Sequence, residues 1–189
     1  MRLIACLLGT CLALAGCDSQ PAPAPQGKAP TASAVPSLPP GRGRLDRSRA
    51  GTPAPTAAFE DPDGELTSLV QFRGKPVLVN LWATWCGPCV AEMPMLDELA
   101  GEAKGYEVLT ISQDVDGREK VDAFFAKHGY RNLEEYLDPE LSMMTEMSVD
   151  TLPTTILYDK DGREVWRMTG REEWNGARAK ALIADTVSG

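Results

Sequence analysis

Two cysteines separated by two residues, Cys86 and Cys89, carry the clearest chemical signal in this 189-residue chain. They follow an apolar run at 77–82, which is typical of a buried strand, and precede a segment typical of a helix. The N-terminus of a helix offers unpaired N–H groups and a partial positive charge, and both stabilise a thiolate. We therefore expect Cys86 to be the exposed, acidic nucleophile. We expect Cys89 to be the sheltered thiol that resolves the mixed disulfide.

A Cys-x-x-Cys pair can instead be half of a structural zinc site, which ordinarily has four ligands. The sequence contains no second such pair, and its only histidine, His128, is better explained as a residue at the C-terminal end of a helix. We therefore expect no metal, no cofactor and no Cys–His hydrolase. A cluster of Met143, Met144 and Met147 could bind Cu(I), but its helical spacing favours core packing.

Strands and helices alternate along the rest of the chain, and two turn signals predict hairpins. Asp-Pro-Asp-Gly at 61–64 predicts a hairpin of strands 57–60 and 66–68, and Asp-Lys-Asp-Gly at 159–162 predicts one of strands 154–158 and 164–169. The remaining predicted elements are strands at 77–82, 106–112 and 136–138, and helices at 86–100 (ended by Gly101 and interrupted by Pro94), 118–127, 139–147 and 172–187. This order predicts an α/β fold around a mixed sheet.

The N-terminus predicts an export signal and an anchor. Residues 1–16 combine a short positive start with an apolar run that is too short to span a bilayer comfortably, as in a signal peptide. The run ends in Leu-Ala-Gly before Cys17, which resembles the lipobox of bacterial lipoproteins. Lipidation would block Cys17, and cleavage would remove Cys6 and Cys11; an ordinary cleaved signal is the alternative. Asp18, which follows Cys17, resembles the signal that retains lipoproteins at the inner membrane of enteric bacteria.

Composition divides the remainder into a tether and a folded part. Residues 17–55 are rich in Pro, Ala, Gly and Ser without a hydrophobic period, so we expect a lipidated Cys17 followed by a disordered linker. Residues 56–189 should form the domain. They contain 13 basic and 25 acidic residues within a chain of net charge −8. A body this acidic repels phosphate backbones, so we expect no nucleic-acid partner.

The segment Trp-Cys-Gly-Pro-Cys at 85–89, which follows the apolar run at 77–82, resembles the active site of thioredoxins. The similarity extends over residues 57–187. Phe-Arg-Gly-Lys-Pro at 72–76, Val-Asn-Leu-Trp-Ala-Thr-Trp-Cys at 79–86, Glu-Met-Pro at 92–94 and Leu-Pro-Thr-Thr at 152–155 resemble the TlpA/ResA group of bacterial envelope thioredoxins. The resemblance implies a thioredoxin fold with an N-terminal β-hairpin. It also implies that residues 113–138 form the helix and strand that this group inserts.

The resemblance also implies roles for single residues. Pro153 would be a cis-proline that faces the cysteines, and Leu152 would offer its backbone to an extended client segment. Glu92 would be the acidic residue near the sulfurs, although a plain surface position is the alternative. Asn80 stands where cytoplasmic thioredoxins carry a buried Asp. The site-supporting residues are then Trp85, Gly87, Pro88, Glu92, Leu152 and Pro153.

By the same resemblance, we expect a lipid-anchored periplasmic thiol–disulfide oxidoreductase that reduces disulfides in client proteins. The implied clients belong to cytochrome biogenesis: apocytochrome c or the copper-site proteins of cytochrome oxidase assembly. A membrane thiol donor would supply electrons. Two alternatives stay open, a DsbA-type disulfide oxidant and a non-enzymatic copper carrier.

Overall fold

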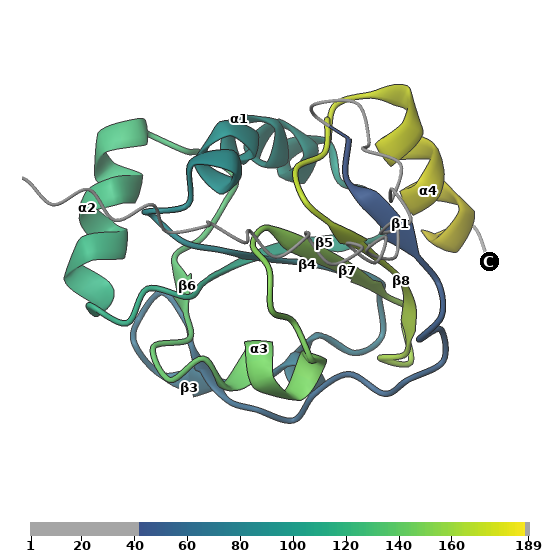
Figure 1. The fold of residues 1–189 in the computed structure, drawn as a ribbon, viewed down its shortest axis with the longest axis horizontal. Helices are drawn as coiled ribbons and strands as arrows, with labels where there is room; N and C mark the ends of the chain where they lie inside the picture. The colour runs from purple at the N-terminus through teal and green to yellow at the C-terminus, as the bar shows by residue number, and fades with distance from the viewer. Residues whose placement is uncertain (1–41, 188–189) are drawn as a thin grey trace, which may run out of the picture. The chain divides into compact units, whose positions relative to one another are not determined.

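The computed structural model describes residues 42–187, which form one layered α/β domain (Figure 1). Within this range, the elements in chain order are β1 (Arg44–Asp46), β2 (Phe59–Glu60), β3 (Leu66–Thr67), the 3-10 helix η1 (Leu69–Phe72), β4 (Val77–Trp82), α1 (Gly87–Glu102), β5 (Glu107–Ser112), α2 (Arg118–His128), β6 (Tyr136–Leu137), α3 (Ser142–Met147), β7 (Thr154–Tyr158), β8 (Glu164–Thr169) and α4 (Ala177–Val187). The predicted signal peptide, Cys17 and the first part of the predicted linker lie outside the described residues.

The strands form a mixed sheet in the order β1-β8-β7-β4-β5-β6-β2-β3. β4 pairs in parallel with β5 and antiparallel with β7, so it lies inside the sheet and all six of its residues are buried. Both predicted hairpins are confirmed, as β2–β3 and β7–β8. The mixed α/β fold expected from the alternation of elements is therefore confirmed.

Helices cover both faces of the sheet (Figure 1). Leu78 and Trp82 of β4 belong to the core that includes buried residues of α1, α2 and α4. Val79 and Leu81 belong to a second core that includes Met143 and Met147 of α3. The split follows from the alternation of side chains along a strand, which sends neighbouring residues to opposite faces. Burial of the two methionines favours packing over a copper site.

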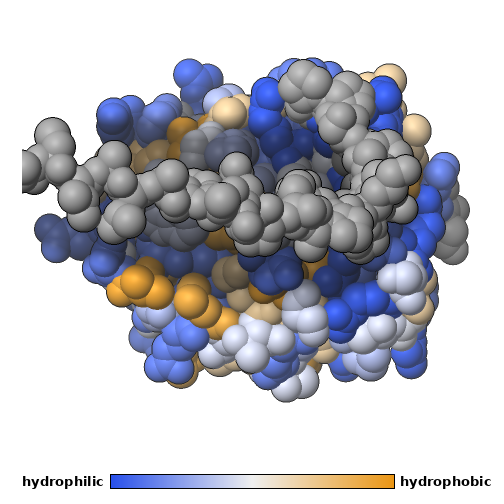
Figure 2. Space-filling view, viewed as in Figure 1, coloured by the Kyte–Doolittle hydropathy of each residue, from blue (hydrophilic) through white to orange (hydrophobic). Residues whose placement is uncertain are grey.

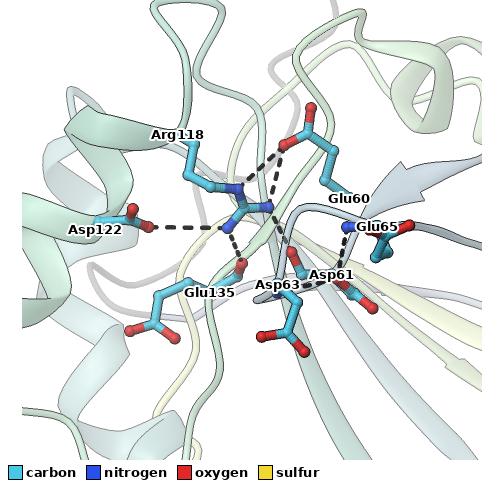
Figure 3. Close-up of polar contacts among 7 residues, drawn as sticks. All are labelled: Glu60, Asp61, Asp63, Glu65, Arg118, Asp122 and Glu135. Atoms are coloured by element: carbon cyan, nitrogen blue, oxygen red, sulfur yellow. Dashed lines mark hydrogen bonds and ion pairs between the residues drawn. The ribbon is translucent and has the colours of Figure 1, made fainter.

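Arg118, at the start of α2, ties the β2–β3 hairpin to the rest of the domain (Figure 3). Its guanidinium donates to Glu60 Oε2 at 3.2 Å, to the Asp61 carbonyl at 2.6 Å and to the Glu135 carbonyl at 3.0 Å. The planar guanidinium has five N–H donors in fixed directions and can donate to these three acceptors at once. The ammonium group of a lysine cannot reproduce this geometry. Arg118 therefore fixes the hairpin by side-chain contacts as well as by strand pairing.

Several predicted boundaries are corrected. β1 pairs with β8, with Arg44 opposite Thr169, so the predicted disordered linker at 17–55 extends too far and the ordered part begins before residue 56. A strand of three residues at the edge of a sheet is held by backbone pairing, and it is too short to show a hydrophobic period in the sequence. Gly101 does not end α1, which continues through Pro94 to Glu102. A Cβ at Gly101 would lie 2.8 Å from Asn132 Nδ2, so this glycine makes room for a neighbouring loop.

Two helices begin later than predicted. α3 begins at Ser142 because the Asp138 carboxylate accepts the N–H groups of Ser142 and Met143, at 3.0 and 2.8 Å. α4 begins at Ala177. In the segment before it, the backbone N–H of Glu172 donates to the Glu92 carboxylate of α1. Where the described residues are visible in Figure 2, the surface is mostly hydrophilic, with a small hydrophobic area on the side that carries β3 in Figure 1.

Candidate redox site

Cys86 and Cys89 form a disulfide where β4 leads into α1. Cys86 is the N-cap residue of α1, and its Sγ accepts the Cys89 N–H at 3.3 Å. Cys86 is 6% exposed and Cys89 is 0% exposed, so the expectation of an exposed Cys86 is wrong. Both cysteines are buried, and Cys86 is only the less buried of the two. The predicted strand-to-helix junction is confirmed. Reduction of this bond would place the Cys86 thiolate at the positive end of the helix dipole, which favours its formation.

The residues around the cysteines differ sharply in exposure. Trp85 is 65% exposed and is one of four exposed large hydrophobic residues in the described range, whereas Trp82 is fully buried. Gly87 and Pro88 are also exposed. An exposed indole beside a redox-active sulfur can contact a client, because a tryptophan offers a large rigid apolar surface at low entropic cost.

The Leu152–Pro153 peptide bond is cis, as the resemblance implies. Pro153 directly precedes β7, where Thr154 pairs with Leu81 of β4. The proline therefore lies at the same end of the sheet as the loop that leads from β4 to Cys86. Leu152 is half-buried and packs against both hydrophobic cores.

Glu92 lies one turn after Cys89 on α1 and is 0% exposed, so the alternative of a plain surface residue is wrong. Its Oε1 accepts from Asn80 Nδ2 at 2.8 Å and its Oε2 accepts the Glu172 N–H at 3.0 Å. Burial raises the pKa of the Glu92 carboxyl to about 7, and the hydrogen bonds from Glu172 and Asn80 lower it by less. A carboxyl that titrates near neutral pH can exchange a proton with a nearby thiol.

Asn80 links Glu92 to the segment that follows the cis-proline. It projects from β4 on the same face as Leu78 and Trp82, toward α1, and its Nδ2 also donates to Thr155 Oγ1 at 2.9 Å. Its Oδ1 is buried without a hydrogen-bond partner. An asparagine here holds the glutamate without adding the second negative charge that an aspartate would bring.

Two polar residues near the site were not predicted. Glu172 supplies the backbone donor to Glu92, and Asp114, after β5, binds Thr84 of the active-site loop. The sequence could have indicated Asp114, because it follows the carboxyl end of β5 as Thr84 follows that of β4. Polar residues at the carboxyl ends of neighbouring parallel strands meet at one edge of a sheet. Among the described residues, no group of three or more His, Cys, Asp and Glu side chains could hold a metal ion.

A model of the Redoxin family matches residues 49–183. The chain belongs to the Redoxin family. Its curated relatives include thiol-disulfide oxidoreductase ResA of Bacillus cereus, 33% identical over 127 residues that cover 67% of this chain and 73% of the relative. ResA of Halalkalibacterium halodurans is 35% identical over 129 residues, which cover 66% and 72% of the two chains. This member of the Redoxin family is therefore a thiol–disulfide oxidoreductase of the ResA type.

Solved structures agree on the fold. A putative thiol:disulfide interchange protein DsbE from Chlorobium tepidum superposes with a TM-score of 0.66 at 24% identity, covering 73% of this chain and 97% of its own. The exposed lipoprotein thioredoxin Etrx1 of Streptococcus pneumoniae gives 0.56 at 28% identity, covering 70% and 97%. This Redoxin-family chain therefore has the thioredoxin fold that the resemblance implies. Within residues 42–187, no helix combines the length and apolar character needed to cross a bilayer.

Proposed function

We propose that this oxidoreductase reduces disulfides in client proteins, with Cys86 as the nucleophile and Cys89 as the resolving thiol. The observation that carries the proposal is the placement of the pair: Cys86 caps the N-terminus of α1, and Cys89 lies one turn deeper at zero exposure. Because Cys86 lies nearer the surface than Cys89, a client sulfur can contact Cys86 before it contacts Cys89. The exposed Trp85 and the segment Leu152–Pro153 would hold the client strand beside it.

The reaction proceeds in two exchanges. The Cys86 thiolate attacks one sulfur of the client disulfide, forms a Cys86–client bond and releases the other client sulfur as a thiolate. The Cys89 thiolate then attacks Cys86 Sγ, forms the Cys86–Cys89 disulfide and releases the second client thiolate. Two electrons pass from the dithiol to the client. Glu92 would accept the Cys89 proton and return it when the pair is reduced again, since its pKa of about 7 suits both directions.

A reducing direction is supported by the Gly87-Pro88 spacer, which matches that of thioredoxin. Thioredoxin has a potential of about −270 mV and the oxidant DsbA one of about −120 mV. We expect a value below about −180 mV for Cys86–Cys89 on equilibration with glutathione. A value above about −150 mV would instead indicate the DsbA-type oxidant.

Mixed-disulfide trapping tests the assigned roles. Cys89→Ser should retain clients through Cys86 when envelope extracts are passed over it without reductant, because the resolving thiol is missing. Dithiothreitol should release those clients and identify them. The matched control, Cys86→Ser, should retain none. Equal capture by both variants would contradict the choice of nucleophile, and no capture by either would contradict the proposed exchange with proteins.

The place of action is also a proposal. Leu-Ala-Gly-Cys at 14–17 supports a lipid anchor, and one structural relative, Etrx1, is described as an exposed lipoprotein. We propose that Cys17 is diacylated and that the domain works in the periplasm, at the inner membrane, with a membrane thiol donor. The clients would be apocytochrome c or the copper-site proteins of cytochrome oxidase assembly, as the TlpA/ResA resemblance implies.

A further inference from the structure

The loop that presents Cys86 is held by a neighbouring segment of the chain. The Cys86 N–H donates to the Ala83 carbonyl at 3.1 Å and closes a turn over residues 83–86. Within this turn, Thr84 donates its N–H to Asp114 Oδ2 at 2.7 Å and its hydroxyl to Asp114 Oδ1 at 2.6 Å. Both oxygens of one carboxylate are thus bound to a single residue, two positions before the redox cysteine.

Asp114 is itself held in place from several sides. Its side chain is fully buried, and Ser112 Oγ donates to its Oδ2 at 2.8 Å. Lys120 Nζ of α2 lies 3.3 Å from its Oδ1. The preceding Gln113 donates its N–H to the Trp82 carbonyl at 2.8 Å, which extends the β4–β5 pairing up to the loop. The carboxylate is therefore a fixed anchor point against which the turn is positioned.

This anchor keeps its charge although it is buried. Burial acts to raise the pKa of the Asp114 carboxyl, but the hydrogen bonds from Thr84, Ser112 and Lys120 outweigh burial and hold this pKa below its ordinary value. Burying a charge in this way is not an efficient route to stability, because apolar residues of similar volume serve a core as well or better. A role in fixing the geometry of the loop explains the carboxylate better than a role in stability.

We propose that Asp114 is a positioning residue for the redox centre: through Thr84 it holds the turn that places Cys86 at the N-terminus of α1. The inference rests on the proposed role of Cys86 as nucleophile. In the disulfide form Cys86 Sγ already accepts the Cys89 N–H at 3.3 Å, and after reduction the N–H groups of the first helical turn would stabilise the Cys86 thiolate. Because hydrogen bonding weakens steeply with poor geometry, a turn that drifts loses part of this stabilisation.

Thr84→Val tests the proposal with the least disturbance, because it removes the hydroxyl but keeps the shape of the side chain and the charge of Asp114. The readout is the pH dependence of iodoacetamide alkylation at Cys86 in the reduced full-length chain, followed by mass spectrometry of the Cys86 peptide. We expect alkylation at pH 7 to slow roughly 3- to 10-fold, with the midpoint of the profile roughly 0.5 to 1 pH unit higher, since the thiolate fraction changes tenfold per pKa unit.

Two variants control for loss of packing. Thr84→Ser retains the hydroxyl donor and should restore the wild-type profile to within about twofold. Thr145→Val removes a comparable hydrogen bond, from Thr145 Oγ1 to the Leu141 carbonyl at 3.0 Å on α3, and should leave the profile unchanged. A shift in Thr84→Ser as large as that in Thr84→Val, or an unchanged profile in Thr84→Val, would overturn the proposal.

Asp114→Asn separates positioning from simple charge. Loss of a nearby negative charge would by itself favour the thiolate and speed alkylation, whereas loss of the anchor slows it. We expect slower alkylation; faster alkylation would overturn the positioning role. If Asp114→Asn does not fold, the comparison of Thr84→Val with Thr84→Ser decides alone. Failure of the proposed function is distinguishable, because a chain that traps no client can still show these shifts at Cys86.

Discussion

Replacing Glu92 with Gln should change how the stability of the protein depends on pH. In the unfolded chain this carboxyl has an ordinary pKa of 4.5, whereas in the folded protein burial raises it to about 7. Between these values the folded state binds the proton more strongly, so this group contributes most to stability below about pH 4.5, and its contribution is lost as pH rises to about 7. At about 1.36 kcal/mol per pKa unit, the loss amounts to about 3 kcal/mol.

Glutamine cannot ionise, so it should avoid this loss. The site can also accommodate its amide: rotating the Asn80 amide would turn Oδ1 toward residue 92, where it accepts from the new NH₂ group. The Thr155 hydroxyl, which now accepts from Asn80 Nδ2, would then donate to Oδ1 instead. We expect the free energy of unfolding of Glu92→Gln, relative to wild type, to rise by about 3 kcal/mol between pH 4.5 and pH 8. The variant should therefore be the more stable protein at pH 8.

Urea denaturation of the oxidised proteins at several pH values measures this difference. Subtracting the wild-type profile cancels every other titrating group, and the disulfide keeps both cysteines from titrating. Glu98→Gln is a matched control on the same helix, since Glu98 is exposed and also accepts a side-chain hydrogen bond, from Asn175. Its profile should stay within about 0.5 kcal/mol of wild type. A Glu92→Gln difference that is constant from pH 4.5 to pH 8 would refute the reasoning.

Two further predictions concern other parts of the chain. Cys17→Ser should leave the protein unacylated and released from membranes, and labelled fatty acid still incorporated in this variant would contradict a lipid anchor at Cys17. Arg118→Lys should lower the free energy of unfolding by about 1–3 kcal/mol, because an ammonium cannot reach Glu60 and the carbonyls of Asp61 and Glu135 together. Urea denaturation checks this, and a loss below about 0.5 kcal/mol would show that the hairpin is held by strand pairing alone.

The redox motif and most elements could be predicted because their signals are local. The apolar run at 77–82, the Cys-x-x-Cys pair and the Asp-Gly turns each lie within a few residues, and the structure places β4, α1 and both hairpins accordingly. Gly129 ends α2 in the left-handed conformation, which glycine adopts without steric cost. These features depend on backbone sterics and side-chain periodicity, which the sequence alone determines.

Contacts between distant segments decided the rest. Whether Glu92 is a surface residue or a buried acid depends on Glu172, 80 residues away, whose backbone covers it. The bond from Thr84 to Asp114 joins residues 30 positions apart, and β1 is a strand only because β8 lies beside it. No local pattern encodes such pairings, since burial and hydrogen bonding at these positions exist only once the sheet has brought the segments together. The sequence therefore determined which atoms react, whereas the tertiary structure decided which groups surround and tune them.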